Sequence, residues 1–301
     1  MNEVVVLMST YNGEKYLTQQ IDSILTQKGV SLKLLIRNDG GNRREETLKI
    51  LNNYIIKDNR IDVIKGENIG CANSFWELLK KAPKSDFYAF ADQDDYWFED
   101  KLATAVNFLK GCNNSIPQLY CCAVEVVDEN LNKIDVDAGG KNYATTFPIT
   151  FVKSLAPGCT FVFNEAARKK CIEYCSCLDI HDWTMAKIVS LFGEIHYDSI
   201  QHMYYRQHGN NVIGASGGLK RILKAAHRLF KNTSSRVQIA SNILNTYYEQ
   251  LSTEQVEKLK IFINYKKNFK NKIKLIKDKE FMPKGFIDRV GFKIFVILGK
   301  I

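Results

Sequence analysis

Strand-like and helix-like stretches alternate along the first 110 residues, and this alternation restricts the possible folds more than any other feature. Short β-rich runs occur at residues 3–10, 31–38, 60–65 and 86–91. Stretches with helical periodicity separate them and also follow the last one, at residues 14–27, 44–56, 73–82 and 97–109. Strands that are joined by helices form a parallel sheet with right-handed crossovers. The sequence therefore predicts an α/β domain of three layers with a mainly parallel sheet.

Unusual polar segments follow each of these strands. They read STYNG at residues 9–13, RNDGG at 37–41, GENIGCANSF at 66–75 and ADQDDYW at 91–97. Ligands bind outside the carboxyl ends of the strands in such sheets, so we expect the four loops to form one crevice. The chain has neither G-x-G-x-x-G after the first strand nor G-x-x-x-x-G-K-[ST] anywhere. The usual phosphate-binding loops are therefore excluded.

Three carboxylates, Asp92, Asp94 and Asp95, follow the fourth strand within four positions. Mg²⁺ and Mn²⁺ prefer oxygen ligands and combine one or two carboxylates with phosphate oxygens. Such an ion would offset the repulsion between the carboxylates and neutralise a departing diphosphate. The alternative is an acidic turn that caps the next helix through Asp95 or Asp100.

The overall composition is that of a soluble protein, with 45% hydrophobic and 25% charged residues. The first residues lack the pattern of a signal peptide, and no run of about 18 uncharged apolar residues occurs. The eight cysteines lack paired spacing for structural zinc. We therefore expect a cytoplasmic protein with reduced thiols.

The net charge of +9 is distributed unevenly along the chain. Residues 1–218 carry 23 basic and 27 acidic side chains, whereas residues 219–301 carry 19 and 6. Within the basic part, the stretches 217–231 and 285–301 have the pattern of amphipathic helices. This extension is expected to bind an anionic membrane surface. The alternatives are that it packs on the preceding domain, forms a homodimer interface or binds nucleic acid.

Taken together, these motifs resemble those of the inverting GT-A glycosyltransferases of family 2, particularly their bacterial rhamnosyltransferase-like branch. The resemblance covers about residues 3–212. LIRNDGG corresponds to a D-D-G-S position, NIGCANSF to an N-x-G segment and ADQDDYW to the metal motif, while HDW and YRQHGNN match two later motifs. The resemblance implies a Rossmann-like GT-A domain over 1–218, with a nucleotide-sugar half (1–110) and an acceptor half (111–218). A helical extension over 219–301 would follow.

The resemblance also implies roles for individual residues. Mn²⁺ or Mg²⁺ would bind at Asp94, with Asp92 and His208 completing the site; a solvated loop is the alternative for His208. Asn38 departs from the family pattern, in which a first aspartate precedes Asp39, and this affects which base is recognised. The residues expected to bind the donor are Thr10, Tyr11, Asn12, Asp39, Asn73, Asp92 and Arg206.

On the acceptor side, the resemblance makes Asp182 the general base that deprotonates the acceptor hydroxyl. Its alternative role is the N-cap of the helix that follows. His181 is interpreted as a packing or acceptor-contact residue, and His196 and His202 as structural. The residues expected on the acceptor side are Gly158, Cys159, Thr160, His181 and Trp183.

The expected reaction is transfer, with inversion, from a nucleotide-diphosphate sugar to a saccharide or lipid-linked acceptor in surface polysaccharide synthesis. The donor would be dTDP-rhamnose or a UDP-hexose, and the enzyme would work at the inner face of the plasma membrane. We expect no nucleic-acid partner, because such a protein has no use for four converging loops. A sugar-phosphate nucleotidyltransferase would need a glycine-rich, arginine-containing loop after the first strand, which STYNGEKY does not supply. An inactive scaffold of the same fold remains the alternative, because of Asn38.

Overall fold

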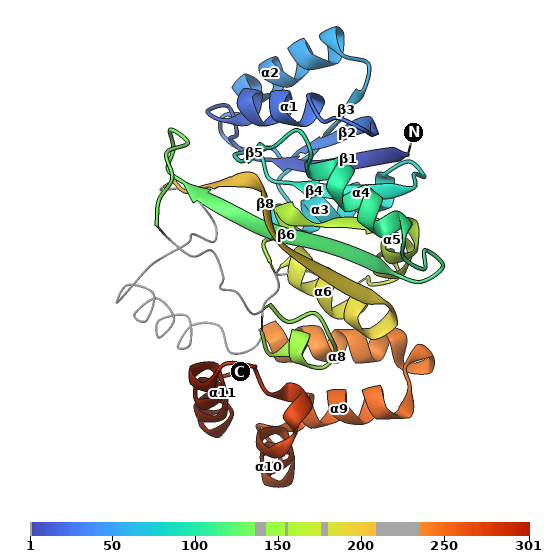
Figure 1. Ribbon diagram of the computed structural model, residues 1–301, viewed down its shortest axis with the longest axis vertical. Helices are drawn as coiled ribbons and strands as arrows, with labels where there is room; N and C mark the ends of the chain where they lie inside the picture. The colour runs from blue at the N-terminus through green and yellow to red at the C-terminus, as the bar shows by residue number, and fades with distance from the viewer. Residues whose placement is uncertain (1, 136–142, 154–155, 176–179, 209–234) are drawn as a thin grey trace.

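The computed structural model describes residues 2–135, 143–153, 156–175, 180–208 and 235–301. Its centre is an eight-stranded sheet in the order β3-β2-β1-β4-β7-β6-β8-β5 (Figure 1). The strands are β1 (Glu3–Thr10), β2 (Ser31–Asn38), β3 (Ile61–Lys65), β4 (Phe87–Ala91), β5 (Tyr96–Trp97), β6 (Gln118–Val127), β7 (Val162–Asn164) and β8 (Glu194–Arg206).

The first four strands are parallel, as the alternation predicts. In the register of the sheet, Met8 of β1 lies between Ile36 of β2 and Ala91 of β4. The second half is mixed, because β7 runs antiparallel to both β4 and β6, and β5 runs antiparallel to β8. The carboxyl ends of β1, β2 and β4 therefore lie side by side.

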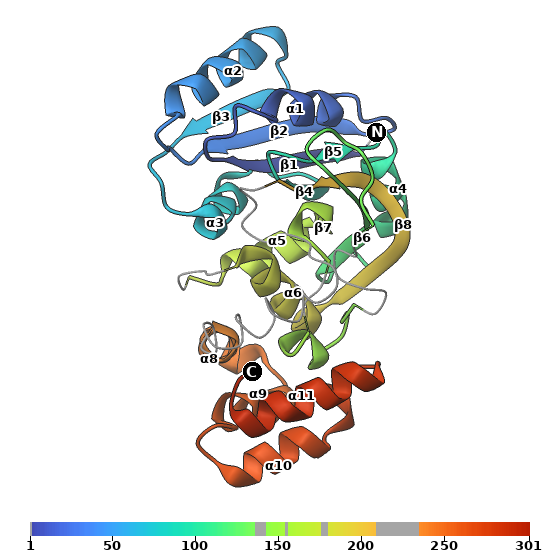
Figure 2. The ribbon, with the colours of Figure 1, turned by 90° about the vertical axis from the view of Figure 1, so that its left-hand side faces the viewer.

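Helices cover both faces of the sheet (Figure 2). Successive side chains of β1 point to opposite faces: Val6 packs in the core of one face with Ile21, and Leu7 in the core of the other with Phe75. The prediction of three layers is confirmed. One face carries α1 (Leu17–Leu25), α2 (Arg44–Lys57) and α4 (Lys101–Lys110), and the other carries α3 (Cys71–Lys81), α5 (Glu165–Ile172) and α6 (His181–Phe192).

The described residues 235–301 form four further α-helices on the side of the molecule that carries α5 and α6 (Figures 1 and 2). Ile243 and Phe262 belong to the same apolar core as Ile188 of α6. Tyr247 donates a hydrogen bond of 2.7 Å to the carbonyl of Lys170. A helical C-terminal region is thus confirmed, and its described part packs on the preceding domain. The helices are α8 (Ser235–Tyr247), α9 (Thr253–Asn264), α10 (Phe269–Lys277) and α11 (Phe286–Leu298).

The stretch 217–231, expected to be a basic amphipathic helix, lies outside the described residues, as does the expected domain boundary at residue 218. Among the helices that the structure describes, none combines the length and the apolar character needed to cross a membrane.

Candidate active site

The ends of β1 and β4 are tied together by a side chain that sequence reasoning missed. The amide of Gln93 accepts a hydrogen bond of 2.9 Å from the backbone N–H of Tyr11 and donates one of 3.1 Å to its carbonyl. Gln93 lies inside the acidic motif, so the loop that carries Asp92 and Asp94 is fixed against the predicted donor loop. The ring of Tyr11 remains 44% exposed and available to a ligand.

Asn12 orders the loop that follows β2. Its side-chain oxygen accepts a hydrogen bond of 3.0 Å from the backbone N–H of Arg43. Gly41 adopts a φ of 108°, and a Cβ atom there would collide with the Asn12 side chain. Only glycine fits this position easily. Asn12, predicted to bind the donor, therefore helps to set the conformation of the loop after β2.

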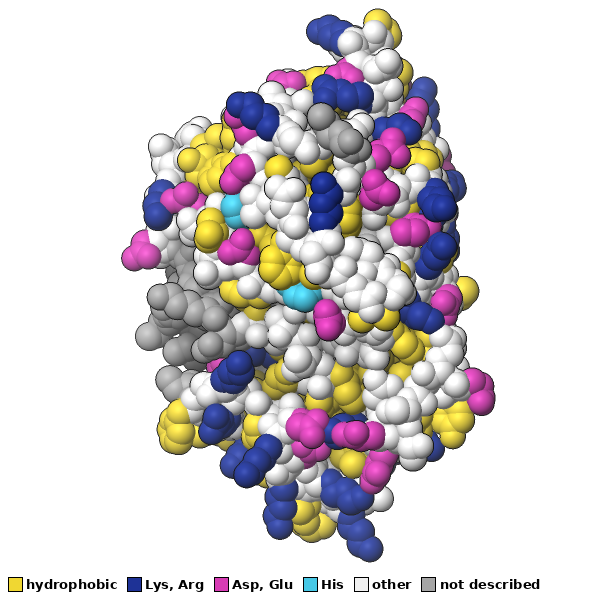
Figure 3. Space-filling model, turned by 45° about the vertical axis from the view of Figure 1, so that its right-hand side comes forward, with side chains coloured by type: hydrophobic (Ala, Val, Ile, Leu, Met, Phe, Trp, Pro, Cys, Tyr) yellow, Lys and Arg dark blue, Asp and Glu magenta, His cyan; other side chains and the backbone are white. Residues whose placement is uncertain are grey.

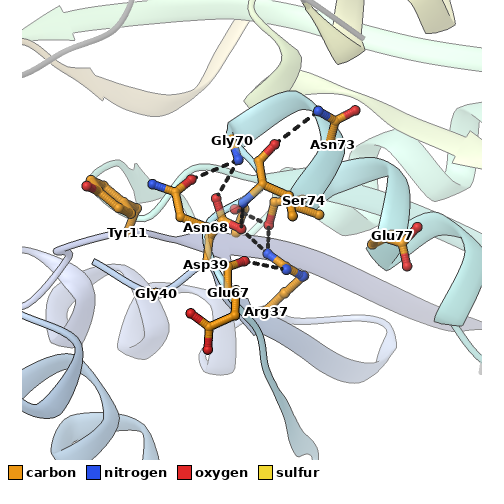
Figure 4. Close-up of polar contacts among 12 residues, drawn as sticks. Tyr11, Arg37, Asp39, Gly40, Glu67, Asn68, Gly70, Asn73, Ser74 and Glu77 are labelled. Carbon is orange, nitrogen blue, oxygen red and sulfur yellow. Dashed lines mark hydrogen bonds and ion pairs between the residues drawn. The ribbon is translucent and has the colours of Figure 1, made fainter. Parts of the chain in front are cut away.

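Asp39 is buried at the carboxyl end of β2 (Figure 4). It forms an ion pair with Arg37 and accepts hydrogen bonds of 3.0 Å from the backbone N–H groups of Ile69 and Gly70, just before α3 begins. A carboxylate is stabilised at this end of a helix. One of its oxygens keeps a second lone pair, so the predicted contact with a base N–H is chemically open.

Two polar groups at the ends of β1 and β2 are buried without a partner among the described residues. They are the hydroxyl of Thr10 and the side-chain N–H₂ of Asn38. The Asn38 oxygen accepts a hydrogen bond of 3.2 Å from the backbone N–H of Gly40. Buried polar groups are normally hydrogen-bonded, so an unpaired donor beside the predicted base contact is a candidate for ligand recognition.

The acidic cluster is largely removed from water. This removal, together with the charges of Asp94 and Asp182, raises the pKa of Asp92 to about 7. Burial raises the pKa of Asp95 well above its usual value, and its Oδ2 has no hydrogen-bond partner among the described residues. Asp92, Asp95 and Cys159 bring one potential ligand atom each within 4.8 Å of one another. A divalent ion binds carboxylate oxygens, and those of Asp92 and Asp95 form no ion pair in the described part of the chain.

The thiol of Cys159 does not fit the hard ions that the carboxylates favour. Burial and the charges of Asp95 and Asp92 raise its pKa well above the usual range, so it stays protonated. Mg²⁺ and Mn²⁺ prefer oxygen to sulfur. Cys159 therefore lines the cluster as a small uncharged side chain.

Asp94 faces a different neighbour. Its Oδ2 lies 2.7 Å from Nε2 of His208, which also packs against the ring of Tyr16 at 4.9 Å. The three residues predicted to bind metal are thus divided, with Asp94 beside His208 and Asp92 beside Asp95. The alternative, in which His208 is a solvated loop residue, does not agree with these two contacts or with a side chain that is 13% exposed.

The alternative in which the acidic cluster caps α4 is not supported. Asp100 occupies the N-cap position but makes no side-chain capping hydrogen bond. Its carboxylate instead contacts Nδ1 of His202 at 3.0 Å. Asp95 accepts a hydrogen bond of 3.2 Å from the backbone N–H of Arg206. The carboxylates at 92–95 therefore have no role in ending or starting this helix.

Arg206 is predicted to bind the donor, and its contacts in the structure are with the protein. Its side chain is buried and donates to the carbonyl of Asp94 at 2.7 Å, to the carbonyl of Glu129 and to the side chain of Gln19. The guanidinium also lies over the ring of Tyr16. A buried guanidinium that donates in this way to protein atoms holds the acidic loop in place, so its visible role is structural.

Lys101 is a second residue that sequence reasoning missed. It is 1% exposed, and its ammonium lies 3.4 Å from the centre of the Trp97 ring. Burial lowers its pKa to about 8, while the charges of Asp95 and Asp92 oppose that shift. Lys101 therefore places a buried counter-charge near the acidic cluster. Its position in an amphipathic helix gives no local signal of this role.

Asp182 lies at the start of α6, next to the short 3₁₀ helix η2 (Gly158–Thr160). Its carboxylate accepts hydrogen bonds of 3.1 Å from the backbone N–H of Gly158 and of 2.7 Å from that of Trp183. The N-cap of α6 is Ile180, so Asp182 belongs to the first turn and is not the cap residue. These two N–H groups fix the orientation of the carboxylate.

The other residues predicted on the acceptor side are mostly buried. Cys159 and Thr160 have almost no exposed surface, so their side chains cannot line an acceptor groove. Gly158 is buried too and contributes through its hydrogen bond to Asp182. His181 stacks on Phe75 at 4.1 Å, and burial lowers its pKa, which identifies a packing role. Trp183 is the partly exposed exception.

Carboxylates from different parts of the chain lie around the start of α3. Cys71 is exposed at the start of α3, yet partial removal from water raises the pKa of its thiol, and four negative charges raise it further. These charges belong to Asp92, Asp182, Asp39 and Asp94. The start of α3 is therefore the point on which the ends of β2 and β4 and the start of α6 converge, as the sequence predicts for the strand ends.

Two hollows lie away from these four carboxylates. One of about 600 Å³ is lined by Arg37, Lys65, Asn73 and Trp76, among others. Another of about 470 Å³ lies near Tyr16 and Glu129. Neither is lined by the acidic cluster or by the predicted base. Asn73, predicted to bind the donor, therefore faces the first hollow, and its amide donates a hydrogen bond of 3.0 Å to the carbonyl of Ile69.

Comparison with known proteins agrees with this geometry. A dTDP-rhamnosyl transferase, RfbG of Shigella flexneri, is 30% identical over 226 residues, which are 71% of this chain and 75% of that protein. The Escherichia coli glucosyltransferase WfaP, which acts on a GlcNAc-diphosphoundecaprenol, is 28% identical over 36% of this chain and 42% of its own length.

Solved structures show the same fold. Staphylococcus aureus TarS in complex with UDP-GlcNAc has a TM-score of 0.60 at 18% identity, covering 99% of this chain and 82% of that one. A mannosyltransferase from Pyrobaculum calidifontis in complex with GDP-Man and Mn²⁺ has a TM-score of 0.53 at 13% identity, covering 99% and 86%. The family model for "Glycosyl transferase family 2" matches residues 5–172. The chain therefore belongs to glycosyl transferase family 2.

Proposed function

We propose that the protein is an inverting, metal-dependent glycosyltransferase that uses a nucleotide-diphosphate sugar. The observation that carries this proposal is the convergence of Asp39, Asp92, Asp94 and Asp182 around the start of α3. An anionic diphosphate cannot approach four carboxylates unless a cation compensates for the charge. This group of carboxylates is therefore suited to a donor that arrives together with a divalent ion.

The residues present fit such an ion. Asp94 with His208, and Asp92 nearby, would hold Mn²⁺ or Mg²⁺, and the unpaired oxygen of Asp95 adds a further acceptor at the same loop. When bound, the ion neutralises charge on the departing diphosphate. Arg206 and Gln93 keep this loop in position through their hydrogen bonds to the backbone of Asp94 and Tyr11.

Asp182 is proposed as the general base. The two backbone N–H groups that bind its carboxylate orient it, and the ionised form accepts the proton of the acceptor hydroxyl. The acceptor oxygen attacks from the side opposite the departing diphosphate, which inverts the configuration at the anomeric carbon. Trp183, the partly exposed neighbour, would contact the acceptor.

We further propose that the donor is dTDP-rhamnose or a UDP-hexose. The support is that the S. flexneri relative, which matches 71% of this chain, is a dTDP-rhamnosyl transferase, and that the E. coli relative uses UDP-glucose. The acceptor would be a saccharide or a lipid-linked saccharide in surface polysaccharide synthesis. A lipid-linked acceptor would place the enzyme on the inner face of the plasma membrane.

Substitution of the base tests the proposal. Asp182→Asn removes the proton acceptor but keeps the shape of the side chain, so transfer should fall about 10²–10⁴-fold. The assay follows release of nucleotide diphosphate from dTDP-rhamnose and UDP-glucose with a panel of acceptors. Asp62→Asn is the matched control, because Asp62 is exposed on the edge strand β3. Undiminished transfer by Asp182→Asn would reject the assignment.

A further inference from the structure

Exposed apolar side chains are concentrated on the last two helices. Fourteen large hydrophobic residues are exposed in the described part of the chain, and seven of them lie between residues 269 and 298. Surface hydrophobic residues that are scattered singly are normal, whereas a contiguous group marks an interaction site. The seven are Phe269, Ile273, Phe286, Val290, Ile294, Ile297 and Leu298.

Five of these residues occupy one side of α11. Their positions, 286, 290, 294, 297 and 298, follow the helical repeat, so their side chains form a single stripe. Phe292 and Val296, on the opposite side, are buried in the core of the C-terminal helices. Asp288 accepts a salt bridge of 2.7 Å from Lys153, which further fixes the inward side of α11. The stripe therefore points away from the protein.

The start of α10 lies beside the end of α11. Lys272 of α10 donates a hydrogen bond of 3.1 Å to the carbonyl of Ile297. Phe269 and Ile273, 75% and 38% exposed, extend the apolar surface on this neighbouring helix. We call the seven apolar residues of the two helices the docking face.

Basic side chains surround the docking face. Residues 265–301 contain eleven Lys and Arg and three Asp and Glu, a net charge of +8. Lys270, Lys274, Lys277 and Lys293 are exposed on the same two helices. In the space-filling view, dark-blue side chains gather at the lower end of the molecule, with yellow surface between them (Figure 3).

We propose that the docking face inserts into the headgroup region of an anionic lipid bilayer. An amphipathic helix with an apolar stripe and flanking lysines lies in the plane of such an interface. Juxtaposed lysines are attracted to the negative surface potential of anionic lipids. A second copy of the chain fits less well, because it would oppose one surface of net charge +8 with another.

Membrane binding would bring the enzyme to a lipid-linked acceptor, and in this respect alone the inference rests on the proposed function. α11 belongs to the C-terminal helices, which pack on the side of the molecule that carries α6 (Figures 1 and 2). Asp182 lies at the start of α6. Attachment through the docking face would therefore place the membrane on the side of the molecule that carries α6.

Co-sedimentation with vesicles tests the inference. The full chain is mixed with vesicles of phosphatidylglycerol and phosphatidylcholine, or of phosphatidylcholine alone, at low and high salt. The wild type should sediment with the anionic vesicles only, and less at high salt. The double variant Phe286→Ser/Ile297→Ser should bind at least about tenfold more weakly, because it removes two exposed apolar side chains, one near each end of the stripe.

Ile55→Ser/Ile56→Ser is the matched control, because these exposed residues lie on α2, far along the chain. It should bind as the wild type does. Equal sedimentation of the Phe286/Ile297 variant and the wild type, or none by either, would overturn the inference. So would a wild-type dimer in solution that this variant converts to monomer, since the face would then join two copies.

Nucleotide binding separates this inference from the proposed function. Both double variants should retain the Mn²⁺-dependent nucleotide binding of the wild type and its thermal unfolding transition, which excludes a folding defect. Vesicle binding by a protein that binds no nucleotide would contradict the proposed function and leave the docking face supported.

Discussion

The carboxylate of Asp182 accepts a hydrogen bond of 3.1 Å from the backbone N–H of Gly158, which lies 24 residues earlier in the chain. This contact joins the start of α6 to the short helix η2, and it fixes the group that we propose as the general base. A base must be held within reach of the hydroxyl that it deprotonates, so the position of η2 matters for catalysis although η2 itself is buried.

Gly158→Ala should impair transfer through this contact. A Cβ atom at residue 158 would lie 2.8 Å from Cβ of Asp182 and 3.2 Å from Nε2 of His181, so Asp182 must move. A misplaced catalytic group costs roughly tenfold to a hundredfold in kcat, while the affinity for nucleotide should stay unchanged. Gly291→Ala is the matched control, because a Cβ there would meet no heavy atom within 4 Å. Wild-type kcat in Gly158→Ala would show that the contact does not position the base.

Metal-dependent nucleotide binding should strengthen between pH 6 and pH 8. Removal from water, with the charges of Asp94 and Asp182, raises the pKa of Asp92 to about 7, so protons compete with a cation in this range. Below the pKa, the affinity for nucleotide should increase by up to about tenfold per pH unit. Above the pKa, the affinity should no longer depend on pH. Titration calorimetry in two buffers of different ionisation enthalpy would detect the proton released at pH 6.5. Asp92→Asn should release none; proton release identical to wild type would exclude Asp92 as its source.

Lys187→Met should make the protein more stable at neutral pH. Lys187 is buried in α6, and removal from water lowers its pKa to about 7, with the charge of Arg236 lowering it further. Between pH 7 and the ordinary value of 10.5, the unfolded chain binds a proton that the native protein does not. The free energy of unfolding of the wild type should therefore rise with pH across this window, by up to about 1.4 kcal/mol per unit.

Urea unfolding at pH 7, 8 and 9 measures this difference. The curve for Lys187→Met should lie above that of the wild type at pH 7 and converge with it as the pH rises, because only the wild type regains stability from this group. Parallel curves for the two proteins would show that Lys187 does not titrate in the native state in this range.

The first half of the domain can be predicted from the sequence because each of its helices and strands is indicated by neighbouring residues. Each βα unit repeats its own periodicity, and the polar loops at 9–13, 37–41 and 91–97 follow directly from where the strands end. The mixed second half is not predictable in this way. β7 has only three residues and pairs with β4, about 75 positions away, so its place in the sheet depends on tertiary packing.

The same limit explains which site residues were missed. Gln93 is recognisable only when its amide meets the backbone of Tyr11, 82 positions away. Lys101 reads as one more charged residue of an amphipathic helix, yet it is buried over Trp97. Conversely, Arg206 and Thr160 match family motifs in sequence, but their side chains are buried against protein atoms. Spacing identifies the loops that meet, but not which side chains point into the space between them.

The central claim is that a nucleotide-diphosphate donor binds together with a divalent ion at Asp94. A thermal-shift panel of UDP, dTDP, GDP, CDP and ADP, each with Mn²⁺ or with EDTA, tests it on the wild type and on Asp94→Asn. A ligand at a hundredfold its dissociation constant adds about 2.7 kcal/mol of stability, which is readily measured. We predict that UDP or dTDP stabilises the wild type only with Mn²⁺, and that Asp94→Asn loses this effect. Stabilisation that persists in EDTA and in Asp94→Asn, or no stabilisation by any nucleotide, would contradict the account.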